Sequence, residues 1–107
     1  MTVQEWFETW LAGLRVVGLE DSTIDGYDRN LHNHVLSTIG AVRLQSLTPV
    51  NLDRLYARLL SEGRRDGRGG LSTKTVRYIS TMIGKALSDA EKKGLVARNV
   101  ARAATAP

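Results

Sequence analysis

The stretch LSTKTVRYISTMIGKALSDAEKKG, residues 71–94, decides the fold class because it predicts one long amphipathic helix. Apolar residues recur in it three and four positions apart, which is the spacing of a helix with a single buried side. Ser72 is the expected N-cap, and Lys92, Lys93 and Gly94 are typical of a helix end. The positions expected to be buried are Val76, Ile79, Met82, Ile83, Ala86, Leu87 and Ala90. A helix with this apolar side needs other elements to cover it.

Two further helices carry strong start and stop signals. Thr2 and Glu5 have the spacing of a capping box, and the helix that follows them ends before Gly18. Pro49, placed directly after a threonine, is typical of a first helical position, and Gly63 ends that helix. The expected core positions are Val3, Trp6, Phe7, Trp10, Leu11 and Leu14 in the first of these helices and Leu52, Leu55, Tyr56, Leu59 and Leu60 in the second.

Between them, another helix is predicted to start at Ser22 and to fade near residues 38–40. Ile24, Tyr27, Leu31 and Val35 follow its buried side. Residues 41–47 alternate apolar and polar positions too briefly to form a sheet, so an extended connector is expected. The connector residues that would fill the core are Val42, Leu44 and Leu47.

Glycine and arginine dominate residues 63–70, and this segment is expected to be a mobile basic loop. Residues 96–104 are expected to hold one short helical turn, and residues 104–107 read as a tail or the start of a linker. No convincing strand is present. The sequence therefore predicts an all-α fold, a single four-helix bundle over residues 1–107 with a short fifth helix.

The chain has 107 residues, a formal net charge of +4 and no cysteine. It lacks an apolar run long enough to span a membrane, and its N-terminus does not resemble a signal peptide, so we expect a cytoplasmic protein. Charge is unevenly placed: residues 1–53 hold three cations and seven acids, whereas residues 54–107 hold twelve cations and four acids. This asymmetry suggests a polyanionic partner, with a solvated basic surface as the alternative.

Groups for catalysis are sparse. His32 and His34 stand two positions apart and would point in different directions on a helix, which is poor geometry for a shared metal ion. Asp28 and His32 are instead expected to form a surface pair. No glycine-rich loop follows a strand, and no serine is placed beside a base. We therefore predict no catalytic residue, no metal site and no cofactor.

The start of the helix over residues 73–93 has the chemistry of an anion site. Ser72, Thr73 and Thr75 supply hydroxyls where the helix also presents unpaired N–H groups, and Ser22 and Thr23 do so on the earlier helix. N-capping alone explains one hydroxyl at each start. It does not explain Lys74, a cation that opposes the helix dipole.

A polar stripe continues from that start. Its members fall on one side of the helix and include no acid: Lys74, Arg77, Tyr78, Thr81 and Lys85. Such a side fits the major groove of DNA, whereas ordinary solvent-facing sides mix both charge signs.

On the helix over residues 22–38 the residues expected to face outward are Gly26, Arg29, Asn30 and Asn33. Gly26 weakens the helix, and its missing side chain would permit close approach of a backbone or another helix. Arg29 and Asn30 have the chemistry to reach base edges, although Asp25 and Asp28 would repel phosphates on the same side. Arg64, Arg65 and Arg68 in the loop would add attraction that does not depend on DNA sequence.

The order of motifs resembles the core-binding domain of phage integrases, the N-terminal SAM-like domain of tyrosine recombinases. The matching segments span nearly the whole chain: VQEWFETWL at 3–11, STIDGY at 22–27, HVLSTIG at 34–40, LQSLTP at 44–49, LSTKTV at 71–76, ALSDA at 86–90 and GLVARNVA at 94–101. The chain departs from the family in lacking a proline within residues 36–38 and after Asn99.

The resemblance implies a four-helix domain that forms half of a clamp around core-site duplex DNA. Its second and fourth helices would cross the major groove, and other recombinase protomers would join it in a tetramer on DNA. The catalytic residues would lie in a following domain, so Tyr27, Tyr56 and Tyr78 are not expected to be nucleophiles. A bacterial or prophage-encoded protein acting on the nucleoid is implied, with the fragment alone a monomer.

The alternative is a helical protein-interaction module that docks through its first helix or its tail and does not touch DNA. A helix-turn-helix regulator fits less well, because the connection over residues 63–71 is too long and too rich in glycine for that motif's tight turn.

Overall fold

The computed structural model describes residues 1–64 and 66–107, and its described residues are helical with short connections. The longer helices are α1 (Val3–Val16), α2 (Asp21–Asn30), α4 (Pro49–Glu62) and α5 (Thr73–Lys92), joined by the short α3 (Leu36–Ile39). A π-helical turn, η1 (Leu31–Val35), links α2 to α3, and the 3-10 turns are η2 (Leu44–Ser46) and η3 (Val100–Ala103). The prediction of an all-α four-helix bundle with a short extra turn is confirmed.

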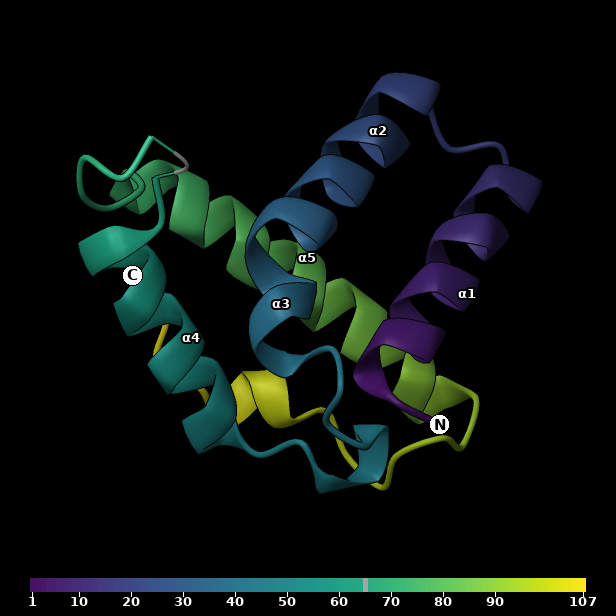
Figure 1. The fold of residues 1–107 in the computed structure, drawn as a ribbon. Helices are drawn as coiled ribbons and strands as arrows, with labels where there is room; N and C mark the ends of the chain where they lie inside the picture. The colour runs from purple at the N-terminus through teal and green to yellow at the C-terminus, as the bar shows by residue number, and fades with distance from the viewer. Residues whose placement is uncertain (65) are drawn as a thin grey trace.

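α5 is the element around which the others pack. Figure 1 shows it running diagonally behind α1, α2 and α3, and it also contacts α4 and η3. All seven of its predicted core residues are buried, as are Trp6, Phe7 and Trp10 of α1. The Trp6 indole donates a hydrogen bond across to the backbone carbonyl of Ala86 at 2.9 Å. Burial of each large apolar side chain stabilises such a core by roughly 1.5–3 kcal/mol.

Three sequence predictions about local structure need correction. Ser22 does not cap α2, because the Glu20 carbonyl already accepts from the amides of Thr23 and Ile24, which places Ser22 inside the first turn. The connector over residues 41–47 is not fully extended but contains η2, although Leu44 and Leu47 are buried as expected. Leu60 is exposed rather than part of the core.

The segment that follows η3 lies against the bundle. Asn99 is buried; its side-chain oxygen accepts from the amide of Ala101, and its amide donates to the Gly84 carbonyl at 3.0 Å. Further on, the Thr105 amide donates to Asp53 of α4, and the Pro107 carbonyl accepts from Arg77 of α5. Thr105 and Pro107, in the segment expected to begin a linker, therefore contact α4 and α5.

Every helix among the described residues is too short or too polar to cross a bilayer.

Candidate nucleic-acid interface

An aromatic stack joins the two helices that were predicted to bind DNA. Trp10 of α1 stacks on Tyr27 of α2 with ring centroids 5.5 Å apart, and Tyr27 meets Tyr78 of α5 at 5.9 Å. The Trp10 indole N–H is held by a hydrogen bond of 2.9 Å to the Asp89 carboxylate. Tilted and offset ring pairs are favourable contacts, so the stack contributes to the packing of α1, α2 and α5 against one another.

Tyr78 approaches α2 at Gly26. A Cβ atom at position 26 would lie 3.0 Å from the Tyr78 hydroxyl oxygen. Gly26 is buried, so the prediction that it faces outward is wrong, and the reason is that α5 covers it. The close approach expected at this glycine is made by the Tyr78 side chain of α5.

Two cations flank this junction. The Lys85 ammonium donates to the Tyr27 hydroxyl at 3.3 Å. Burial raises the pKa of Tyr78 above its ordinary value, with the nearby Tyr27 adding to the rise, while Arg29 and Lys85 oppose it. A phenol with a raised pKa keeps its proton at neutral pH and remains a hydrogen-bond donor. The junction thus presents two cations and a hydroxyl donor together.

The polar stripe of α5 is exposed along its length, at Lys74, Arg77, Tyr78, Thr81 and Lys85. Since successive helix residues turn by roughly 100°, Arg77 and Tyr78 lie at its two edges. α2 borders the Tyr78 edge, and Pro107 borders the Arg77 edge through a 3.2 Å hydrogen bond from Nε. Among the described residues no carboxylate lies within ion-pair distance of Lys74, Arg77 or Lys85.

At the start of α5, two of the predicted hydroxyls serve the helix itself. The Ser72 hydroxyl accepts from the Thr75 amide at 3.1 Å, and the two hydroxyls are 3.0 Å apart. The N-cap prediction for Ser72 is therefore confirmed. Thr73 and Lys74 are exposed in the first turn, and their side chains make no hydrogen bond or ion pair within the described residues. These two side chains are the ones left to face a ligand.

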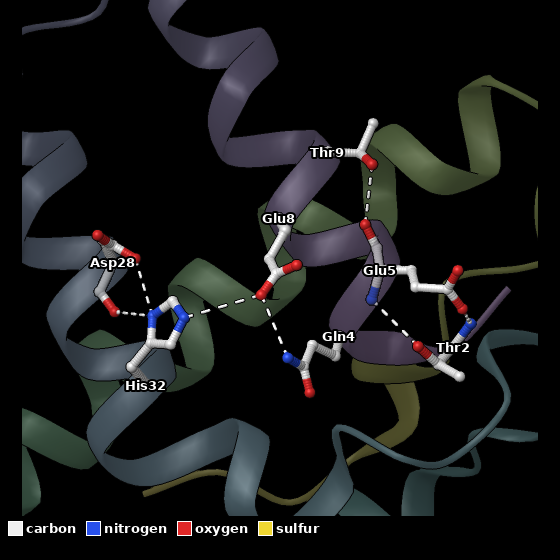
Figure 2. A network of polar contacts seen from close by, with 7 residues as sticks. All are labelled: Thr2, Gln4, Glu5, Glu8, Thr9, Asp28 and His32. Carbon is white, nitrogen blue, oxygen red and sulfur yellow. Dashed lines mark hydrogen bonds and ion pairs between the residues drawn. The ribbon is translucent and has the colours of Figure 1, made fainter.

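Two acids of α2, Asp25 and Asp28, have partners in α1 and η1. Asp25 pairs with Arg15 at 4.0 Å, and Asp28 accepts from the His32 ring at 2.8 Å. Figure 2 shows the His32 ring between Asp28 and Glu8 of α1. The predicted Asp28–His32 surface pair is confirmed. The partners of both carboxylates thus lie outside α5.

The remaining α2 candidates differ in their exposure and in their hydrogen bonds within the chain. Arg29 is exposed, whereas Asn30 is half-buried and donates to the Gly26 carbonyl at 2.8 Å. Ser22 is exposed in the first turn, and Thr23 is half-buried. Arg29 is consequently the best-placed α2 residue beside Tyr78.

Residues 2–60, more than half of the chain, match the family model for the phage integrase N-terminal SAM-like domain. The chain belongs to this family. The solution NMR structure of a phage integrase SAM-like domain from Moorella thermoacetica is similar to it with a TM-score of 0.79 and 36% sequence identity, over 100% of this chain and 86% of that one. An integrase from Saccharopolyspora erythraea is 25% identical over 108 residues.

That match covers 99% of this chain but 23% of the Saccharopolyspora integrase, so the SAM-like domain spans less than a quarter of its relative's length. The resemblance to integrases seen in the sequence motifs is confirmed by all three comparisons.

The loop of this SAM-like domain is more structured than its composition suggested. The Arg64 amide donates to the Gly69 carbonyl, and Gly67 and Gly69 adopt the left-handed backbone that glycine allows. Asp66 pairs with Arg64 at 2.7 Å, and the amide of Arg68 is the main cause that holds the pKa of Asp66 below its ordinary value. Part of the loop's positive charge is therefore neutralised. Arg65 lies outside the described residues.

No group of three or more metal-ligating side chains is placed to hold an ion in residues 1–64 and 66–107. The feature of the SAM-like domain that sequence reasoning missed is the hydroxyl of Tyr27. Its ring is buried as predicted, yet its oxygen reaches Lys85, which is 58 positions away along the chain. No local signal in the sequence indicates that contact.

Proposed function

We propose that this integrase SAM-like domain binds double-stranded DNA through α5 and the adjoining side of α2. The observation that carries the proposal is the exposed α5 stripe with three cations and no carboxylate partner in the described chain. Arg29 adds an exposed cation on α2, the helix against which Tyr78 lies. The DNA major groove is wide enough for one helix, and attraction to phosphates supplies most of the affinity of such a surface.

The residues divide into three roles. Lys74, Arg77 and Lys85 hold phosphates, assisted by hydroxyls at the start of α5 and along it: Ser72, Thr73, Thr75, Tyr78 and Thr81. Arg29 and Asn30 approach base edges from α2, with Ser22 and Thr23 near the backbone. The loop cations Arg64, Arg65 and Arg68 add sequence-independent attraction, weakened by the pairing of Arg64 with Asp66.

Strand cleavage and joining, in this proposal, belong to the rest of a longer integrase. The small share of the Saccharopolyspora relative that the chain covers supports it. So does the state of two tyrosines: Tyr27 and Tyr56 are buried, and burial strongly raises the pKa of Tyr56. Neither phenol is suited to attack a phosphodiester. In this proposal other integrase protomers are partners of the whole protein.

The test is the double replacement Lys74→Ala/Arg77→Ala. Binding to a fluorescein-labelled duplex is measured by anisotropy between about 50 and 200 mM salt. The slope of log affinity against log salt should fall by about 0.9 for each phosphate that the variant no longer neutralises. Arg43→Ala/Arg98→Ala is the matched control, because it removes two exposed arginines that lie outside α2 and α5. An unchanged affinity and slope in the first variant would overturn the proposal.

The alternative, a protein-interaction module, is favoured by one observation. Val16 and Val17, at the end of α1, are 87% and 76% exposed, and Leu19 follows them. If the chain binds no duplex but self-associates, and Val16→Ser/Val17→Ser abolishes that association in sedimentation, the alternative is the correct function.

A further inference from the structure

We propose that Gly26 is a positioning residue of the DNA interface, acting through Tyr78. Because residue 26 has no side chain, the Tyr78 hydroxyl lies against α2, the helix that carries Arg29, and its ring packs on Tyr27, whose hydroxyl accepts from Lys85. There it donates a hydrogen bond to the phosphate that these cations attract. The inference rests on the proposed DNA binding. It adds the residue that determines where the Tyr78 hydroxyl lies in the interface.

The conformation of α2 gives no reason for a glycine at this position. Gly26 lies in the middle of an α-helix and is not among the glycines with positive φ. Glycine is the poorest helix former after proline, so its presence weakens α2. The close approach of Tyr78 is the feature at this position that a larger residue would disturb.

The close contact at position 26 involves a single atom of α5. Outside the backbone of α2 and the neighbouring residues, the Tyr78 hydroxyl oxygen is the one atom within 4 Å of a Cβ built at position 26. A methyl group there would therefore force the hydroxyl to move by a few tenths of an ångström or more and leave the rest of the junction in place. Tyr78 is 40% exposed, so its ring has room to swing outward from the bundle.

The Tyr78 hydroxyl is free to donate a hydrogen bond to a ligand. Within the described residues the Tyr78 ring packs on Tyr27, and its hydroxyl makes no hydrogen bond. It is close enough to Arg29 and Lys85 for both to affect its pKa, and it keeps its proton at neutral pH. A phosphate drawn to the two cations would meet an uncommitted O–H donor beside them.

The experiment compares Gly26→Ala, Tyr78→Phe and the double variant with the parent chain, using anisotropy with the labelled duplex between about 50 and 200 mM salt. Gly26→Ala should bind about three- to tenfold more weakly, the value of about one hydrogen bond. Its thermal midpoint should equal or exceed the parent's, and its salt slope should be unchanged, because the displaced donor is uncharged. Tyr78→Phe should weaken binding by the same factor, and the double variant by no more.

Gly13→Ala is the matched control. Gly13 is an exposed helical glycine in α1 with nothing within 4 Å of a built Cβ, so the variant gains helix propensity without touching the junction and should bind like the parent.

Parent-like binding by Gly26→Ala overturns the inference and leaves the proposed function standing. Additive losses of affinity in the double variant overturn it too, since the two residues would then act separately. So does a salt slope lowered by about 0.9, which means that a cation has moved. If Gly26→Ala lowers the thermal midpoint, Tyr78→Phe decides alone, and parent-like binding by it overturns the inference. A parent chain that binds no duplex overturns the proposed function and this inference together.

Discussion

Replacing Trp10 by alanine is expected to destabilise the domain by about 3–5 kcal/mol, the usual cost of deleting a large buried aromatic side chain. Trp10 is 4% exposed, stacks on Tyr27 and is held by Asp89. The variant therefore loses core packing, a ring pair and the partner of a carboxylate at once. Urea denaturation followed by far-ultraviolet circular dichroism measures the change in the free energy of unfolding.

The neighbouring Thr9→Ala is the control for this prediction. Thr9 is exposed, and its hydroxyl bonds only to the Glu5 carbonyl within α1 (Figure 2). Its effect on the free energy of unfolding should stay within about 0.5 kcal/mol. If Trp10→Ala cost no more than this control, the aromatic stack would not be what holds α1 and α2 on α5.

The double charge reversal Arg29→Glu/Lys85→Glu is expected to weaken duplex binding by more than about 100-fold at low salt. Both cations are exposed, Arg29 on α2 and Lys85 on α5, where Lys85 contacts the Tyr27 hydroxyl of α2. Carboxylates at these positions would face phosphates directly, and like charges in contact across an interface cost several kcal/mol, each 1.4 kcal/mol being tenfold in affinity. Fluorescence anisotropy against the labelled duplex measures the loss of affinity.

A control with the same change in net charge separates position from total charge. Arg43→Glu/Arg98→Glu replaces two exposed arginines that lie outside both helices. This variant should lose far less affinity, because distant exposed charges are largely screened. Equal losses in the two variants would mean that net charge alone drives binding and that the α2–α5 junction has no special role. Both variants should have thermal midpoints near that of the parent chain.

The helices themselves were readable from the sequence because their signals are local. Thr2 and Glu5 are three positions apart, and in the structure each bonds the other's backbone, as the capping-box pattern predicts. Ser72 caps α5 for the same reason. Ser22 failed as a cap because the acidic segment before it already forms the first turn, and hydroxyl preference alone does not separate a cap from an early helical position.

The candidate interface could be predicted only in part from the sequence, because it depends on how the helices pack across one another. Periodicity placed Lys74, Arg77 and Lys85 on one side of α5, and the structure exposes all three. It could not reveal that Asp25 reaches Arg15 of α1, or that the Tyr78 hydroxyl lies over Gly26. Those facts depend on packing between elements far apart in the chain, which no local spacing encodes.

Amide chemical-shift mapping with duplex DNA tests the central claim most directly. On titration of the isotope-labelled chain, the largest shifts should fall in residues 73–85 of α5 and residues 26–30 of α2, and they should fade as salt is added. Shifts confined to residues 16–19 at the exposed end of α1, with α5 unchanged, would contradict DNA binding through the α2–α5 junction.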